Sequence, residues 1–84
     1  MPNQNYIWLK ADGSQGQTDL DHKLTLEEMQ ELVGGYIERV KVGYHGKVRD
    51  MWVNEEGLLD HLPINCEASR IANRPIVGNV FIVL

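Results

Sequence analysis

Cysteine is nearly absent from this 84-residue sequence, which contains Cys66 alone. One cysteine cannot form a disulfide within the chain, and it excludes a zinc site made of several cysteines. Proteins without disulfides are typical of reducing compartments, so we expect a cytoplasmic location. The longest apolar run, residues 80–84, is far too short to cross a bilayer, and we therefore expect no membrane partner.

The motifs of common enzymes and nucleotide-binding proteins are also absent. The sequence has no glycine-rich phosphate-binding loop and no nucleophile motif of the GxSxG type. Its histidines, at positions 22, 45 and 61, are not spaced as metal ligands. Glu55 and Glu56 are adjacent, so on a strand they would point to opposite faces rather than converge as a catalytic pair. We therefore expect no catalytic residue, no metal ligand and no cofactor.

Positive charge is in the minority, with 8 Lys and Arg against 12 Asp and Glu and a formal net charge of −4. Such a chain lacks the general basic surface that neutralises phosphates, so we expect no nucleic-acid partner. One alternative stays open, because basic residues gather in a predicted hairpin at positions 39, 41, 47 and 49. Aromatic residues beside a basic patch can stack on bases. Packing in the core is nevertheless the more common role of Trp8 and Trp52.

Start and stop signals divide the chain into elements. Thr25 followed by Glu28 forms a capping box at the start of a helix, and Gly34-Gly35 end that helix because glycine is a poor helix former. Asn65 is the expected N-cap of a second, shorter helix. Runs of β-branched and aromatic residues predict strands. We expect a strand over 6–10, a mobile loop over 11–23, a helix over 25–33, strands over 36–42 and 47–54, a helix over 66–73 and a strand over 79–84.

This order of elements predicts a small single α+β domain over residues 1–84. The β-α-β-β-α-β order is that of the ferredoxin-like fold. Right-handed crossovers would then put the first and third strands in the middle of the sheet and both helices on one face. A related mixed sheet made of the same elements is the alternative. The continuous apolar run of residues 80–84 indicates a last strand that is packed centrally or covered on both faces, rather than one at an edge.

Polar residues near the strand ends are the candidate binding site. The hairpin places Tyr36 and Glu38 near Asn54, because the start of one strand lies opposite the end of the next. Glu55, which follows Asn54 in the chain, is a further candidate. With Asn65, these residues could hold a cation or an amine, or bind a ligand through the asparagine amides. The alternative is purely structural. The segment 54–57 has the composition of an ordinary turn, and Asn65 can serve only as a helix cap.

Four segments carry a resemblance to a known family: VGGYIE at 33–38, NEEG at 54–57, LPIN at 62–65 and IVG at 76–78. In this order and spacing, residues 26–84 resemble a domain-of-unknown-function family of small proteins found in phages, plasmids and the bacteria that carry them. Cys66 departs from the basic residue that is common at this position in the family. The resemblance implies an origin in a phage or mobile element, and it implies no activity.

We therefore expect a small, non-enzymatic accessory protein that binds and modulates a host or viral protein in the host cytoplasm. The alternative is a protein that binds a small ligand or nucleotide, and an enzyme is the third possibility. Self-association is a further expectation, because a small hairpin leaves a strand edge that must be covered or blunted.

Overall fold

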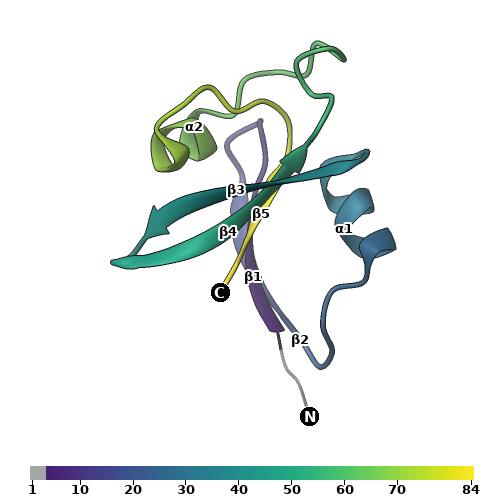
Figure 1. The fold of residues 1–84 in the computed structure, drawn as a ribbon, viewed down its shortest axis with the longest axis vertical. Coiled ribbons are helices and arrows are strands. Elements are labelled where there is room, and N and C mark those ends of the chain that lie inside the picture. The colour runs from purple at the N-terminus through teal and green to yellow at the C-terminus, as the bar shows by residue number, and fades with distance from the viewer. Residues whose placement is uncertain (1–3) are drawn as a thin grey trace.

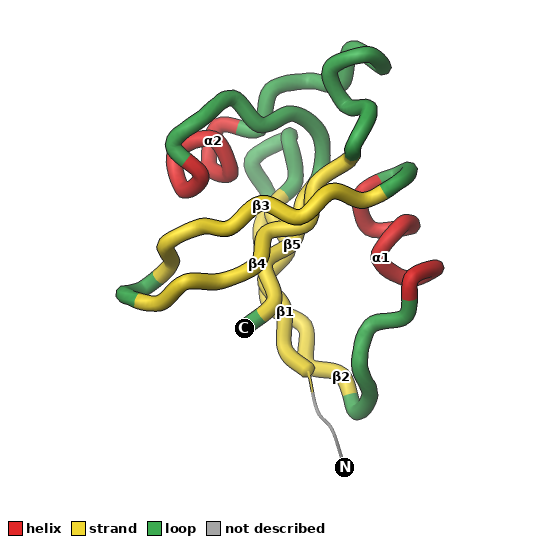
Figure 2. The backbone as a smooth tube through the Cα atoms, in the orientation of Figure 1, coloured by secondary structure: helices red, strands yellow, loops and turns green. Residues whose placement is uncertain are grey.

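The computed structural model describes residues 4–84 and confirms the predicted α+β class. All strands belong to one antiparallel sheet with the order β2-β1-β5-β4-β3 (Figures 1 and 2). The elements in chain order are β1 (Gln4–Leu9), β2 (Gln15–Leu20), α1 (Leu26–Val33), β3 (Ile37–Tyr44), β4 (Lys47–Asn54), α2 (Cys66–Ala72) and β5 (Val80–Val83).

The last strand is the centre of the sheet. β5 lies between β1 and β4 and pairs with both, and Val80, Phe81 and Ile82 are all buried. The prediction of a central, fully covered last strand is thus confirmed. The ferredoxin-like arrangement within the class is wrong, because β5 separates β1 from β4. The physical reason is that a strand with apolar residues on both faces buries more apolar surface in the middle of a sheet than at its edge.

The segment predicted as a loop over 11–23 contains the additional strand β2. A tight turn joins it to β1, in which Ser14 donates from its backbone N–H and its hydroxyl to Asp12 Oδ1, at 2.8 and 2.6 Å. β2 then pairs with the whole of β1, from Gln15 opposite Leu9 to Leu20 opposite Gln4. β2 is an edge strand of mostly polar residues, so its composition resembles that of a loop. Its pairing comes from the neighbouring strand rather than from its own apolar pattern.

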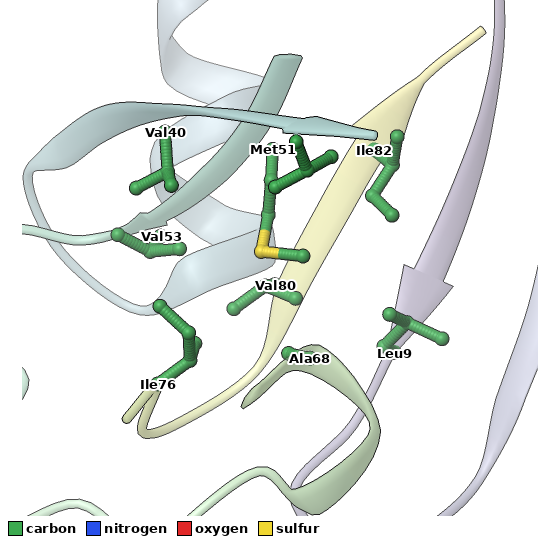
Figure 3. Packing of buried hydrophobic residues seen from close by; sticks show 9 residues of the cluster. Leu9, Val40, Met51, Val53, Ala68, Ile76, Val80 and Ile82 are labelled. Atoms are coloured by element: carbon green, nitrogen blue, oxygen red, sulfur yellow. The ribbon is translucent and has the colours of Figure 1, made fainter. Parts of the chain in front are cut away.

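The two helices cover opposite faces of the sheet, which corrects the expectation that both lie on one face (Figure 1). We call these the α1 face and the α2 face. Because side chains alternate along β5, Val80 and Ile82 pack with Ala68 of α2, whereas Phe81 packs with Val33 of α1. Figure 3 shows the α2-face cluster between the sheet and the helix. Two separate helices are needed because both faces of β5 are apolar.

Helix α1 has the predicted start and end. Glu28 N–H donates to Thr25 Oγ1 at 3.1 Å and Thr25 N–H donates to Glu28 Oε1 at 2.9 Å, so the capping box is confirmed. Gly34 closes the helix in the left-handed conformation with φ 79°, and its N–H donates to Gln30 O at 2.8 Å. A residue with a Cβ would be strained there, which explains glycine at this position.

A histidine bridges this helix start to the preceding loop. His22 Nδ1 lies 2.9 Å from Asp21 Oδ1, and His22 Nε2 lies 3.1 Å from Glu28 Oε1. The hydrogen bond to Asp21, and then that to Glu28, raise the pKa of His22 above its usual value. Because the folded pKa is the higher one, the stabilisation is complete below the unfolded pKa and is lost as pH rises through the folded pKa.

Helix α2 depends on a buried asparagine at its start. Asn65 is 1% exposed, and its Oδ1 accepts from Ala68 N–H at 3.1 Å, so its predicted capping role is confirmed. Its Nδ2 donates in addition to Leu9 O at 3.0 Å and to Gly78 O at 2.8 Å. The side chain therefore joins α2 to the end of β1 and to the turn before β5.

No helix within residues 4–84 has both the length and the apolar content needed to cross a membrane.

Replacing Asn65 with aspartate should destabilise the protein strongly. The substitution keeps an acceptor for Ala68 N–H but removes the donor to two carbonyls and buries a charge. We expect Asn65→Asp to lower the free energy of unfolding by more than about 2 kcal/mol in urea denaturation. The matched control is Asn79→Asp, because exposed Asn79 only accepts from Ala11 N–H, at 3.0 Å. Its effect should stay within about 0.5 kcal/mol. Equal effects of the two substitutions would contradict the role assigned to Asn65.

The titration of His22 should respond to Glu28. Glu28→Gln keeps a capping-box side chain but removes the charge, so the pKa of His22 measured by NMR should fall toward its usual value. The fall in unfolding free energy as pH rises through the wild-type pKa should become smaller in this variant. Glu27→Gln is the control, and an equal decrease in the pKa of His22 in both variants would refute the bridge.

Candidate functional site

The four sequence segments that carry the family resemblance meet at one end of the sheet. We call this region the loop end, consisting of residues 33–36, 54–65 and 76–79. Figure 2 shows the long loop after β4 and the loop before β5 on the same side of the molecule. Backbone bonds join them: Asn65 N–H donates to Ile76 O at 2.8 Å, and Gly78 N–H donates to Pro63 O at 2.8 Å.

Asn54 ties the helix stop to the turn after β4. Its Nδ2 donates to Val33 O at 3.2 Å, and its Oδ1 accepts from Glu56 N–H at 2.8 Å. A Cβ on Gly35 would lie 2.9 Å from Asn54 Nδ2, so the close approach requires glycine there. Asn54 is a buried residue whose amide is engaged inside the protein at both ends.

Close packing joins the other two segments. Gly78 has φ +77°, and a Cβ on it would lie 2.8 Å from Leu62 Cδ1. A Cβ on Gly57 would lie 2.7 Å from Val77 Cγ2. Together with Asn65, these contacts account for most of the resemblance pattern as packing and hydrogen bonding within the loop end.

The predicted site residues are only partly brought together. Glu38, Asn54 and Glu55 line one hollow of about 70 Å³, and Arg74 lines it as well. Arg74 Nη2 lies 4.0 Å from Glu38 Oε2, so a cationic side chain of the protein itself lies beside this carboxylate.

Tyr36 and Asn65 lie outside this hollow. Tyr36 is 64% exposed, and its carbonyl oxygen accepts from Glu55 N–H at 2.8 Å. Asn65 is buried, with its amide engaged by three backbone partners. The exposed members of the predicted set are therefore Tyr36, Glu38 and Glu55, and these remain candidates for contact with a ligand or partner.

A second, larger hollow of about 290 Å³ also lies at the loop end. All four resemblance segments contribute to its lining, through Gly34, Asn54, Pro63 and Gly78. Glu31 and Asp60 also line it, so its charged groups are acidic. This lining suits an uncharged or cationic molecule better than an anion.

The most exposed apolar residues of the loop end were missed by the sequence reasoning. Leu58 and Leu59 are 74% and 78% exposed, and Ile64 is exposed as well. A sequence signal for them exists: the two leucines stand in residues 55–63, which match neither the helical nor the strand period, so no regular element could bury them. Glu55, Glu56 and Asp60 flank the pair in sequence.

The described residues contain no set of side chains arranged as metal ligands. Among residues 4–84, no three histidine, cysteine or acidic side chains converge as possible ligands. Of the loop-end carboxylates, Glu55 and Asp60 each line one of the two hollows, and Glu56 is exposed.

Gly78→Ala should lower the free energy of unfolding by disturbing the packing of the loop end. The new Cβ would meet Leu62 and would impose a side chain on a left-handed residue, so we expect a loss of about 1–3 kcal/mol in unfolding free energy. Gly43→Ala is the matched control, because a Cβ there meets no atom within 4 Å and Gly43 lies in a strand. Chemical denaturation of both variants checks this, and similar midpoints would speak against the packing described.

Comparison with known proteins gives a family but no characterised relative. No curated protein and no solved structure matches the chain. The expected membership in a domain-of-unknown-function family is confirmed, since a family match extends over residues 6–84 and so includes every element from within β1 to β5. The chain belongs to the family described as domain of unknown function DUF3846.

Proposed function

We propose that this protein is a small, non-enzymatic accessory protein of a phage or mobile element that binds and modulates a host or viral protein through the loop end. The observation that carries the proposal is the pair of leucines at 74% and 78% exposure beside three carboxylates. Large apolar side chains cost solubility when exposed together, and such patches commonly mark binding surfaces.

The loop that carries the leucines is held in shape by its own backbone. Asp60 N–H donates to Glu56 O at 2.9 Å, and Leu62 N–H donates to Gly57 O at 3.0 Å. Asn54 fixes the start of this loop and Asn65 its end. A pre-formed loop loses little conformational entropy on binding, so more of the burial energy appears as affinity.

The chemistry of the loop end defines the partner. Leu58 and Leu59 require an apolar cleft, and burying each would contribute about 1.5–3 kcal/mol. Glu55, Glu56 and Asp60 favour basic residues around that cleft, and the net charge of −4 steers the encounter in the same direction. Tyr36, which lies beside Glu55, can extend the contact as a rigid aromatic residue.

A small-ligand function is the second candidate, and the 290 Å³ hollow lined by all four resemblance segments favours it. Glu31 and Asp60 make an amine a better ligand there than a nucleotide. A thermal-shift screen with polyamines, nucleotides and signalling dinucleotides separates the candidates, because only a ligand that binds the native state raises the Tm. A Tm increase with polyamines alone would favour this second function.

Removing the leucine pair should abolish partner binding. The double variant Leu58→Asp, Leu59→Asp should weaken binding by at least about 100-fold, because it replaces two apolar contacts with charges. Its unfolding free energy should stay near that of the wild type, since both side chains are exposed. Quantitative affinity enrichment from host lysate measures the binding.

The matched control is Val48→Asp, which places a charge on an equally exposed apolar residue, 73% exposed, in the β3–β4 hairpin. We expect the wild type and Val48→Asp to retain a partner at stoichiometric level. The double leucine variant should lose that partner. Recovery of no stoichiometric partner, or of the same partner with all variants, would contradict the proposal.

A further inference from the structure

Strand β3 forms one edge of the sheet and carries two basic residues, Arg39 and Lys41, on one face and the acidic Glu38 on the other. It has eight residues and pairs only with β4, so its other side is free of strand partners in the described chain. Arg39, Lys41 and Gly43 are exposed along it. An edge strand of this length presents a row of peptide groups on which another strand can form.

The hydrogen-bond pattern identifies which peptide groups face outward. Glu55 N–H donates to Tyr36 O just before β3 begins, so the pair 36–55 is a hydrogen-bonded one. Such pairs alternate along an antiparallel ladder, and in this register the even-numbered residues of β3 bond to β4. The N–H and C=O groups of Ile37, Arg39, Lys41 and Gly43 therefore point to the free edge.

The side chains of these residues give the edge its charge. Arg39 and Lys41 lie on the α1 face, on which Ile37 packs, whereas Val40 and Val42 are buried under α2. Lys41 Nζ lies 3.5 Å from Asp50 Oδ1 of β4, and Arg39 stands opposite Trp52 rather than a carboxylate. This face of the edge therefore presents two cationic side chains at alternate positions, and Arg39 has no carboxylate opposite it on β4.

A second copy of β3 does not fit this edge. If two copies of β3 paired antiparallel about a two-fold axis, each residue whose peptide groups face the free edge would lie opposite another such residue of the second copy. The registers centred on the middle of β3 place Arg39 opposite Arg39, Arg39 opposite Lys41, or Lys41 opposite Lys41 of the other copy. Each register brings cations face to face, and like charges directly opposite each other destabilise a strand pair.

We propose that the free edge of β3 accepts an extended acidic segment of another protein as an additional strand of the sheet. The backbone of the segment bonds to Ile37, Arg39, Lys41 and Gly43, and glutamate or aspartate at every second position lies opposite Arg39 and Lys41. This mode of recognition takes its affinity from main-chain hydrogen bonds and its specificity from alternate side chains. The surface is separate from the leucine pair of the loop end.

The test uses a capped peptide that alternates threonine and glutamate over the eight-residue length of β3. A second peptide with lysine in place of glutamate is its control. NMR-detected hydrogen exchange should show new protection at the amides of Ile37, Arg39, Lys41 and Gly43 with the acidic peptide only. Protection elsewhere, no protection, or equal binding of the lysine peptide would overturn the proposal.

Two variants isolate the backbone contribution. Lys41→Pro removes an outward N–H without removing a bond to β4, whereas Lys41→Thr removes the same charge and keeps the N–H. The proline variant should bind the acidic peptide about tenfold more weakly than the threonine variant. Equal affinities of the two folded variants for the acidic peptide would overturn the proposal. If the proline variant does not fold, the hydrogen-exchange pattern of the wild type with the acidic peptide tests the proposal instead.

Two further measurements distinguish binding at the β3 edge from binding at the loop end and from pairing between two copies of the chain. The double variant Leu58→Asp, Leu59→Asp should bind the acidic peptide as the wild type does, so failure here and failure at the loop end can be told apart. Sedimentation of the wild type without peptide should give no dimer through this edge. A dimer that protects the same four amides would identify a second copy as the occupant and refute the acidic segment.

Discussion

The side-chain amide of Asn65 is the interaction on which most of the structure depends. It reaches the end of β1, 56 positions earlier in the chain, and at the same time caps α2 and holds the turn that leads into β5. A seven-residue helix such as α2 has little stability of its own. Its position therefore comes from this buried cap and from Ala68 against the sheet, and the core of the α2 face forms beneath it.

Polar residues of the family pattern serve the fold, because they make hydrogen bonds inside the protein. Asn54 and Asn65 are candidates for binding in the sequence, yet their side-chain amides hold loops together. Gly78, another residue of the family pattern, allows close packing against Leu62. The surface that these loops expose consists instead of Leu58, Leu59 and neighbouring carboxylates. In a chain of this size the core is small, so a few buried hydrogen-bonding side chains contribute much of what fixes the exposed loops.

The prediction from sequence succeeded where a signal is local. The capping box of Thr25 and Glu28, the glycine stop of α1 and the Asn65 cap each depend on residues a few positions apart. The prediction failed for β2, whose polar residues form a strand only because β1 offers them a partner. It also failed for Leu58 and Leu59, since no periodic pattern tells whether an isolated apolar pair is buried by a distant element.

The sequence by itself determined the α+β class, the helix boundaries and the central place of the last strand. These follow from local propensity and from an apolar run in β5 that only a doubly covered strand can bury. Only the tertiary structure decided the strand order, the placement of the helices on opposite faces and the outward direction of the β3 peptide groups. Those features depend on contacts between residues far apart in the chain, and no local sequence pattern predicts such contacts.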